Sequence, residues 1–205
     1  KDDAFFIAYY TMYAALLNDP DSSKIRWINV GNINGESIGD ILKSISERLK
    51  NIKAEQGVGS IQYVRLLGVK ANLLKASGRT NQVLEITSEL DIVESALAGV
   101  DLDENYLPVI LELYKNCGDM LRNFADRRGK SQEYYNKARQ LADKYKRLDL
   151  LAGPMRAWLY ISLYEMTGDQ KYKKYIDKMR DSLVYDAMFC RIYYKKFGIP
   201  LKRGE

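Results

Sequence analysis

The chain has 205 residues, of which 46% are hydrophobic and 29% are charged, proportions typical of an ordinary globular protein. It contains no histidine, which excludes Ser/His/Asp and Cys/His nucleophilic centres, histidine general bases and most zinc sites. No apolar run approaches the roughly 18 residues that a membrane-spanning helix needs, so we expect no transmembrane segment.

The first distinctive element is the stretch 18–35, NDPDSSKIRWINVGNING, which breaks the helical spacing found elsewhere. Connections longer than about 12 residues are uncommon within compact domains, and they tend to be functional or to contain a short element. Ile25, Trp27, Asn32 and Gly35 are compatible with a short strand or a single helical turn. We predict a loop here, lying over a neighbouring hairpin.

Three helices are predicted between residues 38 and 99, because apolar residues recur at intervals of three and four. The stripe of the first helix is Ile38, Ile41, Leu42, Ile45, Leu49 and Ile52. Ser60 can cap the second helix and Gly78 can end it. The stripe of this helix is Ile61, Val64, Leu67, Ala71 and Leu74. The third helix starts at Thr80, and its stripe is Val83, Leu84, Thr87, Leu90, Val93 and Leu97.

The second half of the chain repeats this pattern. A helix from Asn105, with Pro108 in its first turn, has the stripe Leu107, Ile110, Leu111, Tyr114, Cys117 and Leu121. Ser131 is predicted to cap its partner, whose stripe is Tyr134, Tyr135, Ala138, Leu141, Ala142, Tyr145 and Leu148. After Gly153-Pro154 the helical spacing continues through Trp158, Leu159, Ser162, Met166, Tyr172, Tyr175, Met179, Leu183 and Tyr194 to Phe197.

The sequence therefore predicts an all-α protein with eight or nine helices and no strand. We expect a single all-helical domain over residues 1–205. Within it, N-terminal helices and the loop 18–35 occupy residues 1–58, and helical hairpins occupy residues 59–205. Cys117 and Cys190 are expected to be free, buried side chains.

Three glycines with similar surroundings support the hairpin interpretation. Gly78, Gly129 and Gly168 lie in KASGRTNQVLEI, ADRRGKSQEYYNKA and EMTGDQKYKKYI. Each glycine separates an apolar helix from another that starts within three residues, so the two helices should be antiparallel neighbours. Successive hairpins of this kind form a solenoid, because one hairpin cannot bury its own apolar face.

This pattern resembles the tetratricopeptide repeat (TPR) over about residues 59–183. The resemblance rests on Tyr135 and Ala138 in YYNKA, on Tyr164 with Gly168-Asp169, and on Gly118 and Leu121 in NCGDML. The family repeats at 34 residues, whereas the three glycines are 51 and 39 residues apart. Lys173 is a second departure, because it lies near a position where the family pattern has alanine. The resemblance implies antiparallel hairpins stacked as a short TPR-like solenoid, with an irregular solenoid or a plain helical bundle as the alternative.

The resemblance also implies a function. Proteins of this family hold peptides or other proteins in a concave groove lined by their first helices, without catalysis or cofactors. In this chain the groove candidates are polar residues on first helices, away from the apolar stripes: Arg65, Asn72, Lys115, Asn116, Arg122 and Arg156. Asp119 follows Gly118 where a carboxylate-clamping subset of the family has asparagine, so we do not expect that clamp. We expect no metal site.

Charge is divided unevenly along the chain. Residues 1–105 hold 11 Lys and Arg against 15 Asp and Glu, a net charge of −4, and residues 106–205 hold 21 against 12, a net charge of +9. This asymmetry suggests an acidic partner for the basic half, whether an acidic peptide, nucleic acid or an anionic membrane surface. Tyrosines interleaved with basic residues can stack bases. Helical spacing instead places Tyr134, Tyr145, Tyr172 and Tyr175 on apolar stripes, so we do not expect nucleic acid to be the partner.

A second hypothesis is a glycan-binding or glycan-processing α/α protein. The segment YEMTGDQKYKKY resembles the TGD-x-x-Y hairpin turn of α/α glycan-processing enzymes and of outer-membrane glycan-binding proteins. Such an enzyme needs two carboxylates facing one cleft, and the spacing of Glu112, Asp119 and Glu165 does not recommend any two of them. The chain begins at Lys1 without a methionine, so we expect a processed or truncated product. Its compartment stays open, with the cytoplasm slightly favoured.

Overall fold

The computed structural model describes most of the chain from residue 36 to residue 145 and part of the C-terminal remainder. The described residues are 6–7, 10, 32–33, 36–103, 105–145, 157, 160–161, 163–165, 167–183, 190, 193–194 and 197–198. They are almost entirely helical, which confirms the all-α class. The chain divides into two compact units, residues 1–131 and 132–205. Because this division falls within one helix, the predicted organisation as a single domain stays a prediction.

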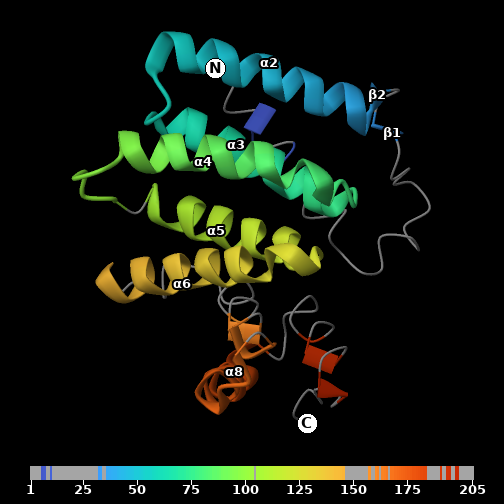
Figure 1. The fold of residues 1–205 in the computed structure, drawn as a ribbon, viewed down its shortest axis with the longest axis vertical. Coiled ribbons are helices and arrows are strands. Elements are labelled where there is room, and N and C mark those ends of the chain that lie inside the picture. Colours follow the sequence, from blue (N-terminus) through green and yellow to red (C-terminus); the bar gives the residue numbers. More distant parts are fainter. Residues whose placement is uncertain are drawn as a thin grey trace. The chain divides into compact units, whose positions relative to one another are not determined.

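The first unit is built from four helices that lie side by side (Figure 1). They are α2 (Ile38–Gln56), α3 (Ile61–Ala76), α4 (Val83–Ala96) and α5 (Leu107–Leu121). Two short 3-10 helices, η2 (Thr80–Gln82) and η3 (Ala125–Arg127), precede α4 and α6 (Arg128–Tyr145). The remaining helix with defined bounds is α8 (Gln170–Leu183). The described residues thus give six bounded α-helices, and the expected eight or nine are not confirmed.

A two-residue ladder precedes α2. Strand β1 (Asn32–Ile33) pairs antiparallel with β2 (Glu36–Ser37). The short strand considered for residues 18–35 is therefore present at its end, and the rest of that loop lies outside the described residues. Ser37 then caps α2: its Oγ accepts from the backbone N of Asp40, whose carboxylate accepts from the backbone N of Ser37 at 3.2 Å. This reciprocal capping box fixes the start of the helix.

Other predicted helix signals are confirmed. Ser60 caps α3, with its Oγ accepting from the backbone N of Tyr63 at 3.4 Å. Pro108 lies in the first turn of α5, where its missing N–H leaves no intrahelical bond unmade. Gly78 has a φ of 71° and Gly168 a φ of 67°, the left-handed conformation that follows a helix end.

The core of the first unit centres on α3. This helix packs against α2, α4 and α5, so it is buried on most of its circumference rather than along one stripe. Its fully buried side chains include Tyr63, Leu66, Leu67, Leu73 and Leu74. The predicted stripes of α2 and α5 are buried at every position. A helix enclosed by three others has no polar outer face to display, which explains why its apolar residues exceed a single stripe.

Several predicted stripe positions are not buried, and Ile61, Leu97 and Met179 are among those that are only half-buried. Leu84 is 43% exposed, because it lies about 100° around α4 from the buried Val83. Tyr175 is 43% exposed at the edge of the α8 face that buries Ile176, and Tyr194 is 57% exposed. Leu141 is only half-buried, at the edge of the α6 face. Trp158, Leu159, Ser162 and Met166 lie outside the described residues.

The α5–α6 connection also differs from the prediction. Gly129 and Ser131 lie inside α6, because η3 leads directly into that helix at Arg128. Ser131 is completely buried and its Oγ donates to the carbonyl of Gly118 in α5 at 2.7 Å. It therefore links two helices instead of capping one.

The second unit has an aromatic core. Ala157, Ile161, Ile176 and Tyr193 form a buried cluster, against which the half-buried residues Tyr160, Tyr164, Met179 and Phe197 pack. The Tyr193 hydroxyl donates to Asp177 of α8 at 3.0 Å. Both cysteines are free, with Cys117 buried and Cys190 half-buried. Among the described residues, no helix is both long enough and apolar enough to cross a membrane.

We expect Leu90→Ala and Leu84→Ala to differ sharply although both change a leucine of α4. Leu90 is completely buried, so its truncation should lower the free energy of unfolding by about 2 to 5 kcal/mol through lost burial and a residual cavity. Leu84 is 43% exposed, so Leu84→Ala should lower the free energy of unfolding by about 0.5 kcal/mol or less. Chemical denaturation measures both. Equal losses would show that α4 packs on a different face.

Gly78→Ala and Gly129→Ala should change stability in opposite directions. An added Cβ meets no atom within 4 Å at either position. At Gly78 it would be forced into a left-handed conformation, at a cost of about 1 kcal/mol or more. At Gly129 it would favour helix by up to about 1 kcal/mol. Thermal unfolding of the two variants tests the assignment of Gly129 to α6, and a loss at both positions would contradict it.

Candidate interaction surface

Helices α3 and α5 run in the same direction with a nearly constant residue offset. Hydrogen bonds join Arg65 to Asn105 and Asn72 to Glu112, each pair 40 residues apart, and Lys75 to Asn116, 41 residues apart. The offset would change steadily along an antiparallel pair. Consequently α3 and α5 are parallel neighbours, and α4 is the helix that lies between them in the sequence.

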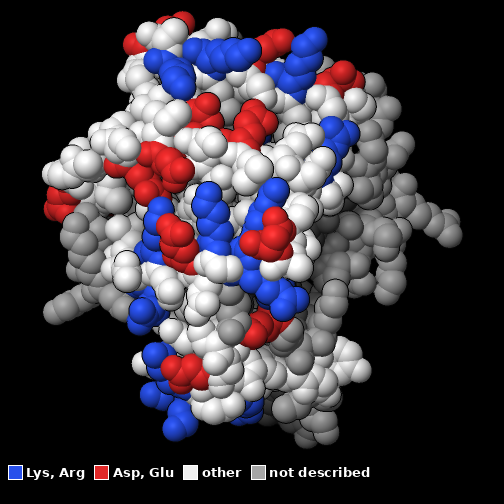
Figure 2. All heavy atoms as spheres, in the orientation of Figure 1, with Lys and Arg blue, Asp and Glu red and all other residues white. Residues whose placement is uncertain are grey.

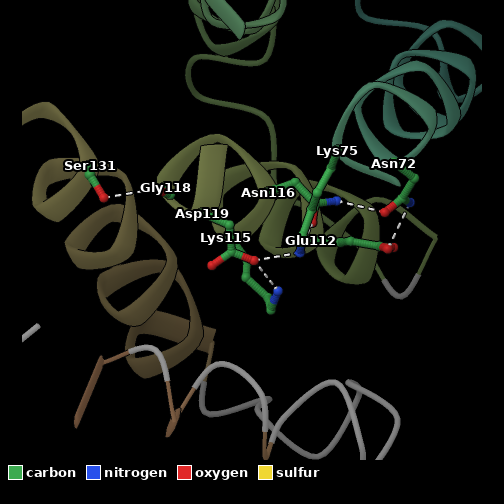
Figure 3. Close-up of polar contacts among 8 residues, drawn as sticks. All are labelled: Asn72, Lys75, Glu112, Lys115, Asn116, Gly118, Asp119 and Ser131. Atoms are coloured by element: carbon green, nitrogen blue, oxygen red, sulfur yellow. Dashed lines mark hydrogen bonds and ion pairs between the residues drawn. The ribbon is translucent and has the colours of Figure 1, made fainter. Parts of the chain in front are cut away.

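Polar side chains form a continuous network across the α3–α5 contact (Figure 3). Asn72 donates to Glu112 at 2.9 Å, and Asn116 donates to the side-chain oxygen of Asn72 at 2.9 Å. Lys75 donates both to Asn116 at 3.1 Å and to Asp119 at 2.5 Å. Each of these bonds connects α3 to α5, so the network ties one hairpin to the next.

The network ends in a buried charged triad. Asp119 accepts from Lys75 and, at 2.6 Å, from Lys115, which lies one turn earlier on α5. The side chains of Lys115 and Asp119 are 3% and 6% exposed, and that of Lys75 is 22% exposed. With Glu112 included, the network holds two formal positive and two formal negative charges. Such balance is needed because an unpaired buried charge costs several kcal/mol.

The electrostatics of the triad result from burial and neighbouring charge. Burial alone would raise the pKa of Asp119, but the ammonium groups of Lys115 and Lys75 outweigh it and hold that pKa below its usual range. Burial lowers the pKa of Lys115; Asp119 opposes this change, and the charge of Lys75 adds to it. Asp119 therefore remains the fixed anion of the triad.

The structure brings together three of the six predicted site residues. Asn72, Lys115 and Asn116 all belong to the network, and the last two are buried. Arg65 is exposed and lies on the same pair of helices, where it donates to Asn105 at 3.3 Å. Arg122 is half-buried and follows the last turn of α5. Arg156 lies outside the described residues.

Sequence reasoning missed three members of the network. Lys75, Glu112 and Asp119 connect the predicted residues to one another. The available signal was spacing: Lys115 and Asp119 are four apart, as are Glu112 and Asn116, on a helix that is otherwise apolar. Polar residues that recur at helical spacing within an apolar helix predict a partner for that face, but the partner proved to be α3 of the same chain.

The polar network holds α3 and α5 together, and most of its groups are not accessible to a ligand. The Lys75, Lys115 and Asp119 groups are engaged with one another and largely hidden from solvent. The solvent-accessible part of the contact between α3 and α5 lies toward the start of both helices. Arg65 and Asn105 are exposed there, and Glu112 is half-buried. We call this accessible part the α3–α5 face. No family model, curated protein or solved structure matches the chain.

Asp119→Asn should be strongly destabilising. The change removes the anion but leaves Lys115 and Lys75 in a buried environment, and loss of one partner of a buried ion pair costs about 3 to 5 kcal/mol. Lys115→Met is the control: Asp119 keeps Lys75, and the loss should be nearer to about 1 kcal/mol. Urea denaturation of the two variants measures the difference. A larger loss for Lys115→Met would contradict the central role of Asp119.

The ion pairing of Asp119 should also make the stability of the protein depend on pH in the acid range. In the folded state the pKa of Asp119 lies below the ordinary value of 3.8, so its stabilisation is complete above about pH 4 and is lost as pH falls through the lowered pKa. Between about pH 5 and pH 2, the wild type should therefore lose more stability than Asp119→Asn. Parallel pH profiles would show that Asp119 is not held as a buried anion.

Proposed function

We propose that this protein is a non-catalytic scaffold of TPR-like helical hairpins that binds a protein or peptide partner. The observation that carries the proposal is the parallel packing of α3 on α5, with an offset of 40 to 44 residues along the contact. In a helical solenoid, the first helices of successive hairpins are parallel neighbours because each hairpin stacks on the previous one in the same orientation.

The hairpin pattern supports this interpretation in two ways. Helices α3 and α4 form one hairpin, and α4 also contacts α5, the first helix of the next. The offset exceeds the 34 residues of the TPR and falls near that of other helical-hairpin repeats, at about 40 to 47 residues. The proposed solenoid is therefore TPR-like in its stacking rather than in its repeat length.

The α3–α5 face supplies groups suited to a peptide. Arg65 and Asn105 provide exposed donors and acceptors, and Asn72 and Glu112 border them. Side-chain amides and a guanidinium group can pair with peptide carbonyl and N–H groups without any reacting centre. For the glycan-processing alternative, Glu112 and Asp119 are two of the three carboxylates considered, with Glu165. Asp119 is held by two lysines and Glu112 by Asn72, so these contacts favour the scaffold over that alternative.

The proposal predicts that peptides selected for binding will depend on Arg65. Peptides enriched from a random display library should protect backbone amides of α3 and α5 from hydrogen exchange more than those of α2. Arg65→Glu should weaken the selected peptides about tenfold, because a hydrogen bond to a charged group is worth about 1.5 kcal/mol or more.

Lys50→Glu is the matched control, since Lys50 is another exposed basic residue on a helix, α2, and the charge change is the same. This variant should bind the selected peptides like the wild type. The proposal fails if no peptide is enriched over a denatured control, or if Arg65→Glu and Lys50→Glu bind equally well.

A further inference from the structure

Helix α8 of the second unit has one face in the core and one in solvent. Tyr172 and Ile176 are 5% and 0% exposed, and Met179 packs on the same cluster. A solvent-facing side presents Lys171, Lys174, Tyr175 and Lys178, all exposed. Lys171 and Lys178 each lie three or four positions from both Lys174 and Tyr175, so the four residues lie together on the helix surface. We call them the α8 lysine-tyrosine face.

The basic residues of α8 are not equally neutralised. Lys173 pairs with Asp177 at 2.8 Å, and Asp177 also accepts from Tyr193. Lys171 pairs with Asp169 at 3.0 Å. By contrast, within the described part of the chain neither Lys174 nor Lys178 has an ion-pair partner. Two adjacent ammonium groups thus repel one another across one helical turn, and an external anion would relieve this repulsion.

Tyr175 gives the face a fixed aromatic element. Its ring lies 5.2 Å from that of Tyr160, which also contacts the ring of the buried Tyr172 at 6.4 Å. Tyr175 is therefore 43% exposed yet supported from beneath. A tyrosine held in this way contributes contact area at low entropic cost, which is why tyrosine is common at protein interfaces.

The sequence of the second unit has a net charge of the same sign. Residues 132–205 contain 16 Lys and Arg against nine Asp and Glu, a net charge of +7. Figure 2 shows mainly basic side chains over the described part of the α8 region, whereas acidic and basic groups are interspersed over α2 and α4. The field around the α8 lysine-tyrosine face should therefore attract an anionic partner.

We propose that the α8 lysine-tyrosine face docks an acidic segment of a partner protein. Lys174 and Lys178 would pair with carboxylates one helical turn apart, and Tyr175 would pack against the backbone or an apolar side chain between them. The spacing of the two lysines matches acidic residues at i and i+4 on a helix. The face carries no exposed aliphatic side chain that would insert into a bilayer, and its three lysines make a short patch rather than a track along a nucleic-acid backbone.

This surface is additional to the α3–α5 face and lies on a helix of the other compact unit. Its lysines are not among the groove candidates that the sequence predicted, which include Lys115. Lys115 is buried and paired with Asp119, so it is not available to an external anion. Lys174 and Lys178 are available.

The test uses the whole chain and a fluorescein-labelled helical peptide with glutamates at i and i+4, together with its glutamine counterpart. Fluorescence anisotropy should show that the glutamate peptide binds and that the glutamine peptide does not, and added salt should weaken the binding of the glutamate peptide. Lys174→Glu combined with Lys178→Glu should reduce affinity on the order of tenfold or more, because each exposed ion pair is worth up to a factor of about five. Tyr175→Ala should reduce it several-fold.

The control is Lys43→Glu combined with Lys50→Glu, which changes two exposed lysines of α2 and alters the net charge equally. This variant should keep wild-type affinity for the glutamate peptide. Equal losses in the two double variants, or no binding of the glutamate peptide by the wild type, would overturn the proposal. Tighter binding to labelled oligothymidylate or to phosphatidylserine-containing vesicles than to the peptide would also overturn it, in favour of nucleic acid or of membrane.

Discussion

The contact between α3 and α5 depends on one buried carboxylate. Asp119 on α5 accepts hydrogen bonds from Lys75 on α3 and from Lys115 on its own helix. Apolar burial around these residues supplies the stability of the contact, because a buried ion pair adds little net stability over well-packed hydrophobic groups. Its effect is on register. Sliding α5 along α3 by one turn would leave buried charges unpaired, whereas leucines can repack in a shifted position.

That register determines how the first unit is assembled. With α3 and α5 fixed as parallel neighbours, α4 must lie against both, and α2 covers the remaining side of α3. Gly68 contributes to the same fit, since an added Cβ would come within 3.3 Å of Val109 on α5. The polar network and the close helix approach thus act at the same interface. The network also occupies polar groups that would otherwise be available to a ligand.

Internal ion pairing determines which lysines can interact with an external anion. Lys75 and Lys115 neutralise Asp119 inside the first unit, while Lys174 and Lys178 of α8 remain exposed. Whether a lysine serves the fold or the surface is therefore decided by its neighbours. The two proposed surfaces also differ in chemistry: the α3–α5 face offers neutral amides beside single charges, and the α8 lysine-tyrosine face offers a concentrated positive charge beside a supported aromatic ring.

The sequence by itself determined the helical class, the stripes of α2 and α5, and the helix ends at Ser60, Pro108 and Gly78, because spacing, capping and backbone conformation act within a few residues. Only the tertiary structure decided that α3 is enclosed on three sides, that Ser131 bonds to α5, and that Asn72, Lys115 and Asn116 pair inside the protein. A polar residue on an apolar helix has the same local pattern whether it faces solvent, a ligand or another helix. The contacts between α3 and α5 join residues 40 to 44 positions apart, beyond the reach of any local pattern, and only the register of the packed helices brings them together.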